Sequence, residues 1–204
     1  MVQIKIIRHS NRLDHSNPFR WAVSFGHYWY DSPLTEYGHN MARIKGQKLA
    51  SENFCPKYIY TSPYIRTMAT ATEIKTSFPH TEIIIESLLA EYQPSTGHTI
   101  ILYPNGIPTI YDGQETGFSY PETYENFEKR IQFIISKLIE KSDGDIIIIT
   151  HGEVLKTYIN YIQSMYQDLL LDPGTTPYLT TLSFDYDKAN NKINEKTVRI
   201  ENKQ

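Results

Sequence analysis

The chain opens with VQIKIIRHS at residues 2–10, which predicts a β-strand with Arg8 and His9 at its exit. Residues 145–152 read DIIIITHG, where four consecutive isoleucines are typical of a strand buried on both faces, followed by His151. In an open α/β sheet, the residues just beyond the carboxyl ends of the strands line the functional crevice. The two histidines therefore predict a histidine-built site, and Arg8 favours an anionic substrate. Two unrelated loop histidines are the alternative that this pair alone leaves open.

Strands and helices alternate along the rest of the chain. We expect strands at residues 2–7, 57–61, 82–86 and 145–150, helices at about 36–51, 62–77, 121–141 and 153–165, and a hairpin of residues 178–186 and 192–200. This order predicts an α/β fold, a three-layer α/β/α sandwich around a mostly parallel sheet, with the antiparallel C-terminal hairpin at the sheet edge. The first strand and the strand before His151 are expected to be central neighbours, which would bring both histidines to one edge of the sheet.

Local signals define the starts and the buried faces of these helices. Thr35 is expected to cap the helix at 36–51, whose buried face is predicted from three apolar residues at helical spacing: Tyr37, Met41 and Ile44. Ser62 is expected at the cap of the next helix, with Pro63 at its first position.

Two long segments have no convincing periodicity. Residues 10–32 form an irregular stretch rich in aromatic side chains, and such a long loop in a compact domain is usually functional. Residues 92–119 contain several glycines and prolines and are predicted to be a loop-rich insertion. Because no linker or repeat divides the chain, we expect residues 1–204 to form one domain.

The composition excludes several classes of function. The formal net charge of −3 argues against a nucleic-acid or membrane partner, because both require a dense basic face. Cys55 is the only cysteine, which leaves no disulfide framework and no thiolate metal site. Without an apparent export segment or membrane span, a cytoplasmic location is the simplest expectation. The 16 tyrosines are interpreted mainly as packing residues, and an exposed tyrosine-rich face leaves a homodimer open.

Three further residues are candidates for the same site. Arg66 falls in the first turn of a helix that follows a strand, where free amides and the helix dipole already favour an anion. Its guanidinium suits a phosphate, and Arg12, four residues beyond Arg8, can turn back toward the same pocket. Glu91 is a candidate general acid if partial burial raises its pKa. These arguments alone do not separate Glu91 from its competitors, which are Glu86, Asp112 and Glu115.

Five blocks in this order closely resemble the histidine phosphatase (phosphoglycerate mutase-like) superfamily: residues 8–10 (RHS), 31–38 (DSPLTEYG), 61–67 (TSPYIRT), 89–91 (LAE) and 150–152 (THG). The resemblance covers nearly the whole chain. It implies that His9 is the nucleophile of a phosphohistidine intermediate and that Glu91 is the proton donor. It also implies a phosphate pocket formed with Arg8, Arg66 and His151.

The motif at residues 8–14 (RHSNRLD) and the segment from Tyr120 through Arg130 look more like one branch, the suppressor-of-T-cell-receptor-signalling phosphatases. By this resemblance Arg12 joins the phosphate pocket, and phosphotyrosine enters as a substrate class beside other aryl or small phosphate esters. The expected partner is thus a phosphorylated small molecule or a phosphoprotein.

The resulting expectation is a metal-independent phosphomonoester hydrolase of the histidine acid phosphatase type, without a cofactor. Arginines take the role of a cation, and although His9, His151 and a carboxylate allow a zinc site on paper, a neighbouring arginine opposes it. A phosphoglycerate mutase-like phosphotransferase is the second reading, disfavoured because the Glu91 region lacks the glutamate-arginine pair of the glycolytic mutases. A weakly active phospho-ligand binder is the third, because Ser10 replaces the glycine usual after the nucleophile.

Overall fold

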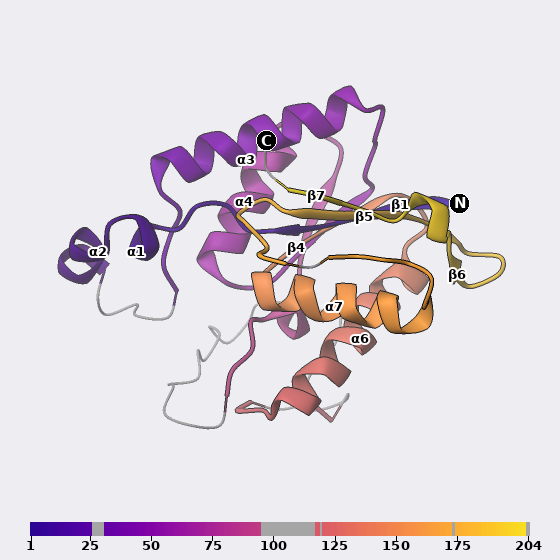
Figure 1. Ribbon diagram of the computed structural model, residues 1–204. Coiled ribbons are helices and arrows are strands. Elements are labelled where there is room, and N and C mark those ends of the chain that lie inside the picture. Colours follow the sequence, from indigo (N-terminus) through magenta and orange to yellow (C-terminus); the bar gives the residue numbers. More distant parts are fainter. Residues whose placement is uncertain (26–30, 95–116, 119, 173, 203–204) are drawn as a thin grey trace.

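The computed structural model describes residues 1–25, 31–94, 117–118, 120–172 and 174–202, and its strands form one mixed sheet (Figure 1). The strands are β1 (Val2–Arg8), β2 (Tyr58–Thr61), β3 (Glu82–Ile85), β4 (Ile146–Thr150), β5 (Thr181–Asp187), β6 (Lys192–Ile193) and β7 (Arg199–Glu201). The order across the sheet is β3-β2-β4-β1-β5-β6, with β7 paired to β5. The first four of these strands run parallel, and β5 joins them antiparallel to β1.

Helices cover both faces of this sheet. They are α1 (Leu13–Ser16), α2 (Pro18–Phe25), α3 (Glu36–Ser51), α4 (Ile65–Lys75), α6 (Tyr124–Lys141) and α7 (Gly152–Met165), with short 3-10 turns η2 (Ser87–Leu89) and η3 (Glu195–Thr197). In Figure 1, α3 and α4 lie on one side of the sheet and α6 and α7 on the other. The predicted α/β/α sandwich, with its C-terminal antiparallel strands at the sheet edge, is confirmed.

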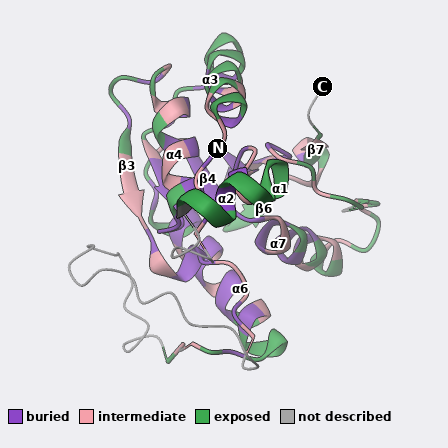
Figure 2. Ribbon diagram, turned by 90° about the vertical axis from the view of Figure 1, so that its left-hand side faces the viewer, coloured by how far each residue is buried: buried purple, intermediate pink, exposed green. Residues whose placement is uncertain are grey.

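Strand β4 is buried on both faces, as its isoleucines predict. Ile146 and Ile148 belong to the apolar core under α6 and α7, whereas Ile147 and Ile149 belong to the core under α3 and α4. All four isoleucines are fully buried (0% exposed). Figure 2 shows buried residues along α6 as well, the helix that covers one face of this strand. Because each face of the strand meets a different helical layer, its four isoleucines alternate between the two apolar cores.

The buried face of α3 differs from the expectation. Tyr37 and Ile44 are 57% and 54% exposed and Met41 is half-buried, while the buried residues are mostly small: Gly38, Ala42, Gly46 and Leu49. A Cβ atom at Gly38 would lie 2.3 Å from the carbonyl oxygen of Asn11. The helix lies so close to the loop after β1 that only glycine fits there, so the prediction of a buried Tyr37 and Ile44 was wrong.

The two long segments have different outcomes. The stretch at 10–32, expected to be irregular, contains the short helices α1 and α2, with Trp21 of α2 buried. Its aromatic residues 28–30 lie outside the described residues. Most of the insertion at 92–119 also does, including the competing carboxylates Asp112 and Glu115. Among the described residues, no helix has both the length and the apolarity that a membrane crossing requires.

Candidate active site

The predicted site lies where β1 and β4 end side by side. These strands are paired parallel neighbours, with Arg8 opposite Thr150, and the backbone N–H of His9 donates to the Thr150 carbonyl at 2.8 Å. The imidazoles of His9 and His151 are both buried, and their ring centroids are 5.5 Å apart. Strand pairing thus brings together two histidines that are separated by most of the chain.

The ring of His9 is held as a neutral imidazole. Its Nδ1 lies 2.8 Å from the carbonyl oxygen of Ser10. Because a carbonyl only accepts hydrogen bonds, Nδ1 carries the proton and Nε2 keeps its lone pair. Burial lowers the pKa of His9 well below its usual range, and the nearby Arg66 and His151 lower it further. The arrangement leaves a nitrogen nucleophile ready at neutral pH.

His151 is oriented by two partners on opposite ring nitrogens. Its Nε2 lies 2.8 Å from the hydroxyl of Ser62, and its Nδ1 lies 3.1 Å from Nη2 of Arg66. Nδ1 also lies 3.2 Å from Oε2 of Glu91, so this nitrogen faces both a donor, the guanidinium, and an acceptor, the carboxylate. Burial lowers the pKa of His151 to about 4, against the opposing influence of Glu91. His151 is therefore a neutral imidazole at neutral pH.

Ser62 does not have the role predicted for it. Helix α4 begins at Ile65 with Tyr64 as its N-cap residue, so Ser62 and Pro63 precede the helix. The backbone N–H of Ile65 is instead accepted by the carboxylate of Asp31, at 2.9 and 3.1 Å from its two oxygens. The serine hydroxyl instead forms a hydrogen bond with His151, which follows a strand far away in the sequence. A capping rule considers only residues near the start of the helix, so it could not predict this partner.

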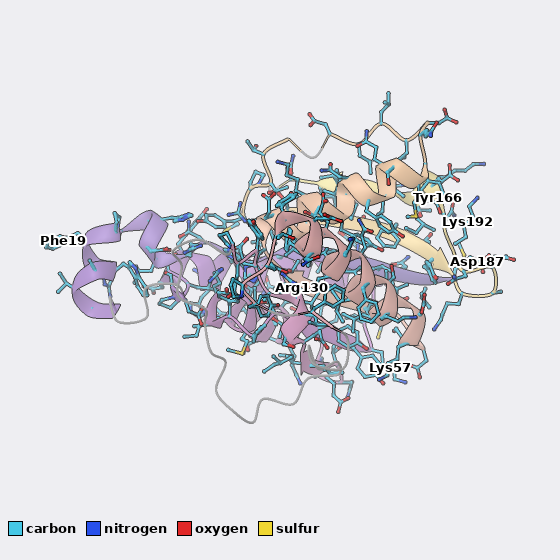
Figure 3. All side chains as sticks on the ribbon, turned by 90° about the horizontal axis from the view of Figure 1, so that it is seen from below. Phe19, Lys57, Arg130, Tyr166, Asp187 and Lys192 are labelled. Atoms are coloured by element: carbon cyan, nitrogen blue, oxygen red, sulfur yellow. The ribbon has the colours of Figure 1, made fainter. Side chains whose placement is uncertain are left out.

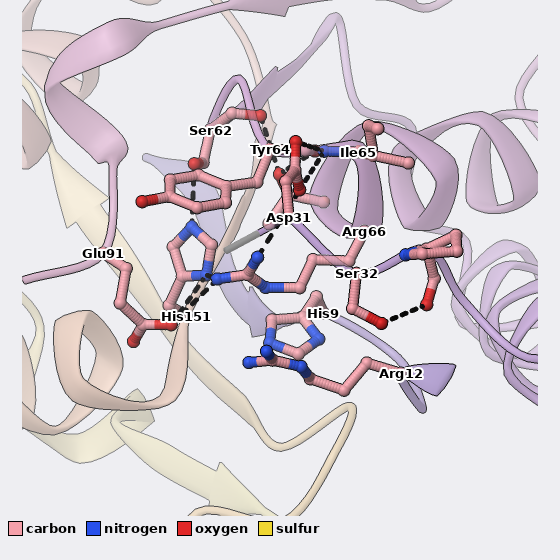
Figure 4. A network of polar contacts seen from close by, with 12 residues as sticks. His9, Arg12, Asp31, Ser32, Ser62, Tyr64, Ile65, Arg66, Glu91 and His151 are labelled. Atoms are coloured by element: carbon pink, nitrogen blue, oxygen red, sulfur yellow. Dashed lines mark hydrogen bonds and ion pairs between the residues drawn. The ribbon is translucent and has the colours of Figure 1, made fainter. Parts of the chain in front are cut away.

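Arg66 and Glu91 meet His151 at the N-terminal end of α4 (Figure 4). Nη2 of Arg66 is 3.1 Å from Oε2 of Glu91, and Nδ1 of His151 is 3.2 Å from the same oxygen. On its other side, Nη1 of Arg66 is 3.5 Å from Asp31. The guanidinium is buried, at the positive end of a helix, where an anion is favoured.

The charge state of Glu91 differs from the expectation. Burial by itself would raise its pKa, but His151 and Arg66 outweigh this effect and hold the pKa of Glu91 well below its usual range. The Arg66 guanidinium lies 3.1 Å from the Glu91 carboxylate and so favours its charged form. Glu91 is thus a carboxylate before substrate binds, and the predicted upward shift from partial burial is wrong for this state.

Arg8 is fixed by the loop before β5. Its Nη1 donates to the carbonyl of Thr176, and its guanidinium lies 4.6 Å from the ring centroid of Tyr178. Burial lowers the pKa of Arg8, and the nearby charges of Arg12 and Arg66 lower it further. Its Nε–H is buried without a hydrogen-bond partner among the described residues. A phosphate oxygen would satisfy this donor.

Arg12 is close to the other arginines but is engaged elsewhere. Its Nε donates to Asp14 at 2.6 Å, and Nη2 forms a second bond to the same carboxylate. Residue 12 also forms an isolated bridge with Leu34, which places the loop after β1 against the segment before α3. The sequence predicted the proximity of Arg12 to the pocket; the ion pair with Asp14 was not foreseen.

Ser10 fits the backbone without strain. Its hydroxyl donates to the carbonyl of Gly38 at 2.7 Å, and its N–H donates to the hydroxyl of Thr70 at 3.0 Å. Among the described non-glycine residues, positive φ occurs only at Asn53, Leu179 and Asn191, so residue 10 does not need glycine for its conformation. Through these two hydrogen bonds Ser10 connects the loop that follows His9 to α3 and α4.

Several residues of the site were missed from the sequence: Asp31, Ser62, Tyr64 and Tyr178. The ring of Tyr64 lies 4.8 Å from that of His151 and 4.2 Å from the Arg66 guanidinium. The ring of Tyr178 lies 5.7 Å from that of His9, and its hydroxyl is 2.9 Å from Nδ1 of His15. Three of them had a signal, since they lie in or beside the DSPLTEYG and TSPYIRT blocks, whereas Tyr178 had none.

A metal ion is the other group that such a cluster can hold. His9, Glu91 and His151 each offer one ligand atom, and these atoms lie within 4.8 Å of one another. The Arg66 guanidinium, however, lies 3.1 Å from two of these side chains, where it would repel a cation. The donor set suits a phosphate better than a divalent metal.

The sequence is similar to those of known proteins. The sequence profile of the histidine phosphatase superfamily (branch 1) matches residues 20–197. The "Uncharacterized phosphoglycerate mutase family protein R708" of Acanthamoeba polyphaga mimivirus is 63% identical over 201 residues, which is 98% of each chain. The human ubiquitin-associated and SH3 domain-containing protein B is 28% identical over 170 residues, covering 82% of this chain and 25% of that protein.

A solved structure supports the fold. The ecdysone phosphate phosphatase from Bombix mori, in complex with tungstate, superimposes with a TM-score of 0.69 at 18% identity, over 100% of this chain and 93% of that one. At such low identity the likeness concerns the fold alone. The expected α/β fold, with its mixed sheet and flanking helices, is confirmed.

Proposed function

Because the chain belongs to the histidine phosphatase superfamily, branch 1, we propose that it hydrolyses phosphate monoesters through a phosphohistidine on His9, without a metal ion. The observation that carries this proposal is the state of His9. A buried neutral imidazole, with Nδ1–H given to the Ser10 carbonyl, leaves the Nε2 lone pair as the reactive group.

The phosphate is held by the positive groups around this nitrogen. Arg8, Arg12 and Arg66 offer guanidinium donors, and the neutral His151 is converted to a cation when a phosphate dianion raises its pKa. Preorganised donors of this kind stabilise the charge on the equatorial oxygens of the transferring phosphoryl group. The three guanidiniums are the reason to propose that no metal ion is needed.

In the first step, Nε2 of His9 attacks phosphorus in line with the ester oxygen. The N–P bond forms as the P–O bond breaks, and the leaving oxygen takes a proton from Glu91. Glu91 is ionised in the free protein, but the negative charge of the bound phosphate dianion raises its pKa, so that Glu91 takes up a proton from solvent when the substrate binds.

In the second step, the Glu91 carboxylate takes a proton from water as the water oxygen attacks phosphorus. The N–P bond breaks, its electron pair returns to Nε2 of His9, and inorganic phosphate is released. One carboxyl group thus acts first as acid and then as base.

For the substrate we propose an aryl phosphate, with protein phosphotyrosine as one class. The RHSNRLD motif supports this class, because it resembles the corresponding motif of the suppressor-of-T-cell-receptor-signalling branch. Tyr178, half-buried beside His9, offers an aromatic surface near the reacting nitrogen.

Turnover of 4-nitrophenyl phosphate in the presence of a chelator tests the mechanism. We expect hydrolysis by the wild-type protein and its loss in His9→Ala. His80→Ala is the matched control, because His80 is exposed and precedes β3, at the opposite edge of the sheet. Full activity of His9→Ala, or activity that the chelator abolishes, would contradict the proposal.

Two further measurements separate the remaining alternatives. Acid-labile, base-stable phosphate on the protein after a rapid quench is expected for the wild type and not for His9→Ala. A screen of phosphotyrosine peptides, steroid phosphates, sugar phosphates and nucleotides should show the aryl class as preferred. Transfer of phosphate between sugars would favour a mutase instead, and binding without turnover would favour a phospho-ligand binder.

A further inference from the structure

The segment that carries Glu91 is bound by a buried ion pair between Arg130 of α6 and Glu122, which lies just before that helix. Arg130 and Glu122 are both buried, and their side chains form two hydrogen bonds, Nε to Oε2 at 2.9 Å and Nη2 to Oε1 at 2.5 Å. The site as described above does not use either residue. Figure 3 places Arg130 in the body of the molecule, in contrast to Phe19, which projects from α2.

The remaining donors of Arg130 go to the backbone just before Glu91. Its Nη1 donates to the carbonyl oxygens of Leu88 at 2.5 Å and of Ala90 at 3.0 Å. The carbonyl between them, of Leu89, accepts from the Thr150 hydroxyl at 3.0 Å. Three consecutive carbonyls therefore have side-chain donors, two of them supplied by one guanidinium.

Glu122 holds the backbone just after Glu91. Its N–H donates to the carbonyl of Gln93 at 2.9 Å, and its carboxylate accepts from the Gln93 N–H at 3.4 Å. The ring of Tyr92, between these positions, packs against Phe127 of α6 at 5.2 Å. The ion pair thus has contacts on both sides of Glu91, and Glu122 joins residue 93 to the chain just beyond the long insertion.

We propose that Arg130 and Glu122 are positioning residues that fix the Glu91 carboxylate against Arg66 and His151. A buried ion pair is weak evidence for stability, because its desolvation cost often equals its attraction and apolar residues of the same volume serve as well. Here the pair does something that apolar residues cannot do, since it binds backbone groups on either side of one acidic residue. This inference rests on the proposed function, in which Glu91 protonates the leaving oxygen.

The dependence of rate on the leaving group tests this role. Phenyl phosphate needs its basic leaving oxygen to be protonated, whereas 2,4-dinitrophenyl phosphate does not. A displaced Glu91 should therefore lower kcat/KM for phenyl phosphate and spare the dinitrophenyl ester. A variant that only unfolds part of the protein lowers both by the same factor, and so the ratio of the two rates separates position from stability.

A graded set of variants gives the expected order. Glu91→Gln should lower the phenyl-to-dinitrophenyl ratio of kcat/KM most, by about a hundredfold. Arg130→Met should lower it by about tenfold and Arg130→Lys by less, because a lysine keeps the charge but loses the fork that reaches both carbonyls. Glu122→Gln, which keeps one acceptor oxygen, carries the test if Arg130→Met does not fold.

Leu138→Ala is the control for a merely structural effect. Leu138 is buried in the apolar core two turns further along α6, and its loss should destabilise the helix without changing the ratio. The double variant Glu91→Gln/Arg130→Met should have the ratio of Glu91→Gln alone, because two residues that act through one group are not additive.

The results separate the positioning role of Arg130 and Glu122 from the proposed function of the site. A lowered ratio in Glu91→Gln with a wild-type ratio in Arg130→Met and Glu122→Gln would overturn the positioning role and leave the proposed function intact. A wild-type ratio in Glu91→Gln would overturn both the proton-donor role and this inference, while loss of phosphohistidine in His9→Ala would still support covalent catalysis.

Discussion

Replacing Ser10 by glycine, the residue usual in this position of the superfamily, tests whether the serine is a defect or a fitted part of the site. Ser10 is 1% exposed, and its hydroxyl donates to the Gly38 carbonyl. Its own carbonyl, which holds Nδ1 of His9, belongs to the backbone and is present in either variant. The substitution therefore removes a link to α3 and keeps the contact that orients the nucleophile.

The magnitude follows from these contacts. Loss of a buried hydrogen bond costs about 1.5 kcal/mol. The added backbone freedom of glycine in the unfolded chain costs about 0.5–1 kcal/mol more. The free energy of unfolding should thus fall by about 2 kcal/mol, and for a chain of this length Tm should fall by roughly 4–8 °C. Because the His9 contact persists, kcat/KM should change by less than about tenfold.

The assay combines thermal unfolding with turnover of 4-nitrophenyl phosphate. Ser10→Ala is the matched control, since it removes only the hydroxyl and should lose about 1.5 kcal/mol. An increase in kcat/KM of more than about tenfold in Ser10→Gly would show that serine suppresses activity, and would favour a weakly active phospho-ligand binder. A Tm at or above that of the wild type would refute the assignment of a stabilising role to the hydroxyl.

Three further predictions follow from contacts around the site. His151 has a pKa of about 4 in the folded protein against 6.5 for an ordinary histidine side chain, so between these values the unfolded state binds more protons. The contribution of His151 to the free energy of unfolding should therefore rise with pH through this window by about 1.4 kcal/mol per unit. Urea unfolding at pH 4–7 should show a weaker dependence of the free energy of unfolding on pH for His151→Asn than for the wild type. An unchanged dependence would contradict the assignment of His151 as neutral in the folded protein. Gly38→Ala would place a methyl group 2.3 Å from the Asn11 carbonyl oxygen, so we expect a loss of more than about 2 kcal/mol in chemical denaturation; a stable variant would refute the close packing of α3. Asp31→Ala removes the acceptor for the first N–H of α4 and a partner of Arg66, so steady-state kinetics should show KM raised about three- to tenfold, and an unchanged KM would show that Arg66 is oriented without it.

The strands and most of the helices were predictable because their signals are local. Four isoleucines before His151 identify a strand buried on both faces, and Thr35 accepts a hydrogen bond from Gly38 as an N-cap should. The start of α4 was predicted wrongly for the opposite reason. Its first N–H is bound by Asp31, 34 positions earlier in the chain, and a capping rule considers only neighbours in sequence.

Part of the candidate site was predictable, because the carboxyl ends of parallel strands lie at the same edge in every open α/β sheet. His9, His151, Arg66 and Glu91 lie together as expected, and Arg8 lies beside them. The charge states were not predictable, since a pKa depends on burial and on charges from distant segments. Glu91, expected to have a raised pKa, has a lowered one because Arg66 and His151 surround it.

The sequence by itself determined the α/β architecture, the family and five of the residues that meet at the sheet edge, namely Arg8, His9, Arg66, Glu91 and His151, because these follow from periodicity, local signals and ordered motifs. The tertiary structure decided which nitrogen of His9 is free, which partner holds each arginine, and how Ser10 is accommodated against Gly38. It also placed the buried Arg130–Glu122 pair behind Glu91. The physical reason is that hydrogen bonds and desolvation depend on distances across the folded chain, which no local pattern contains.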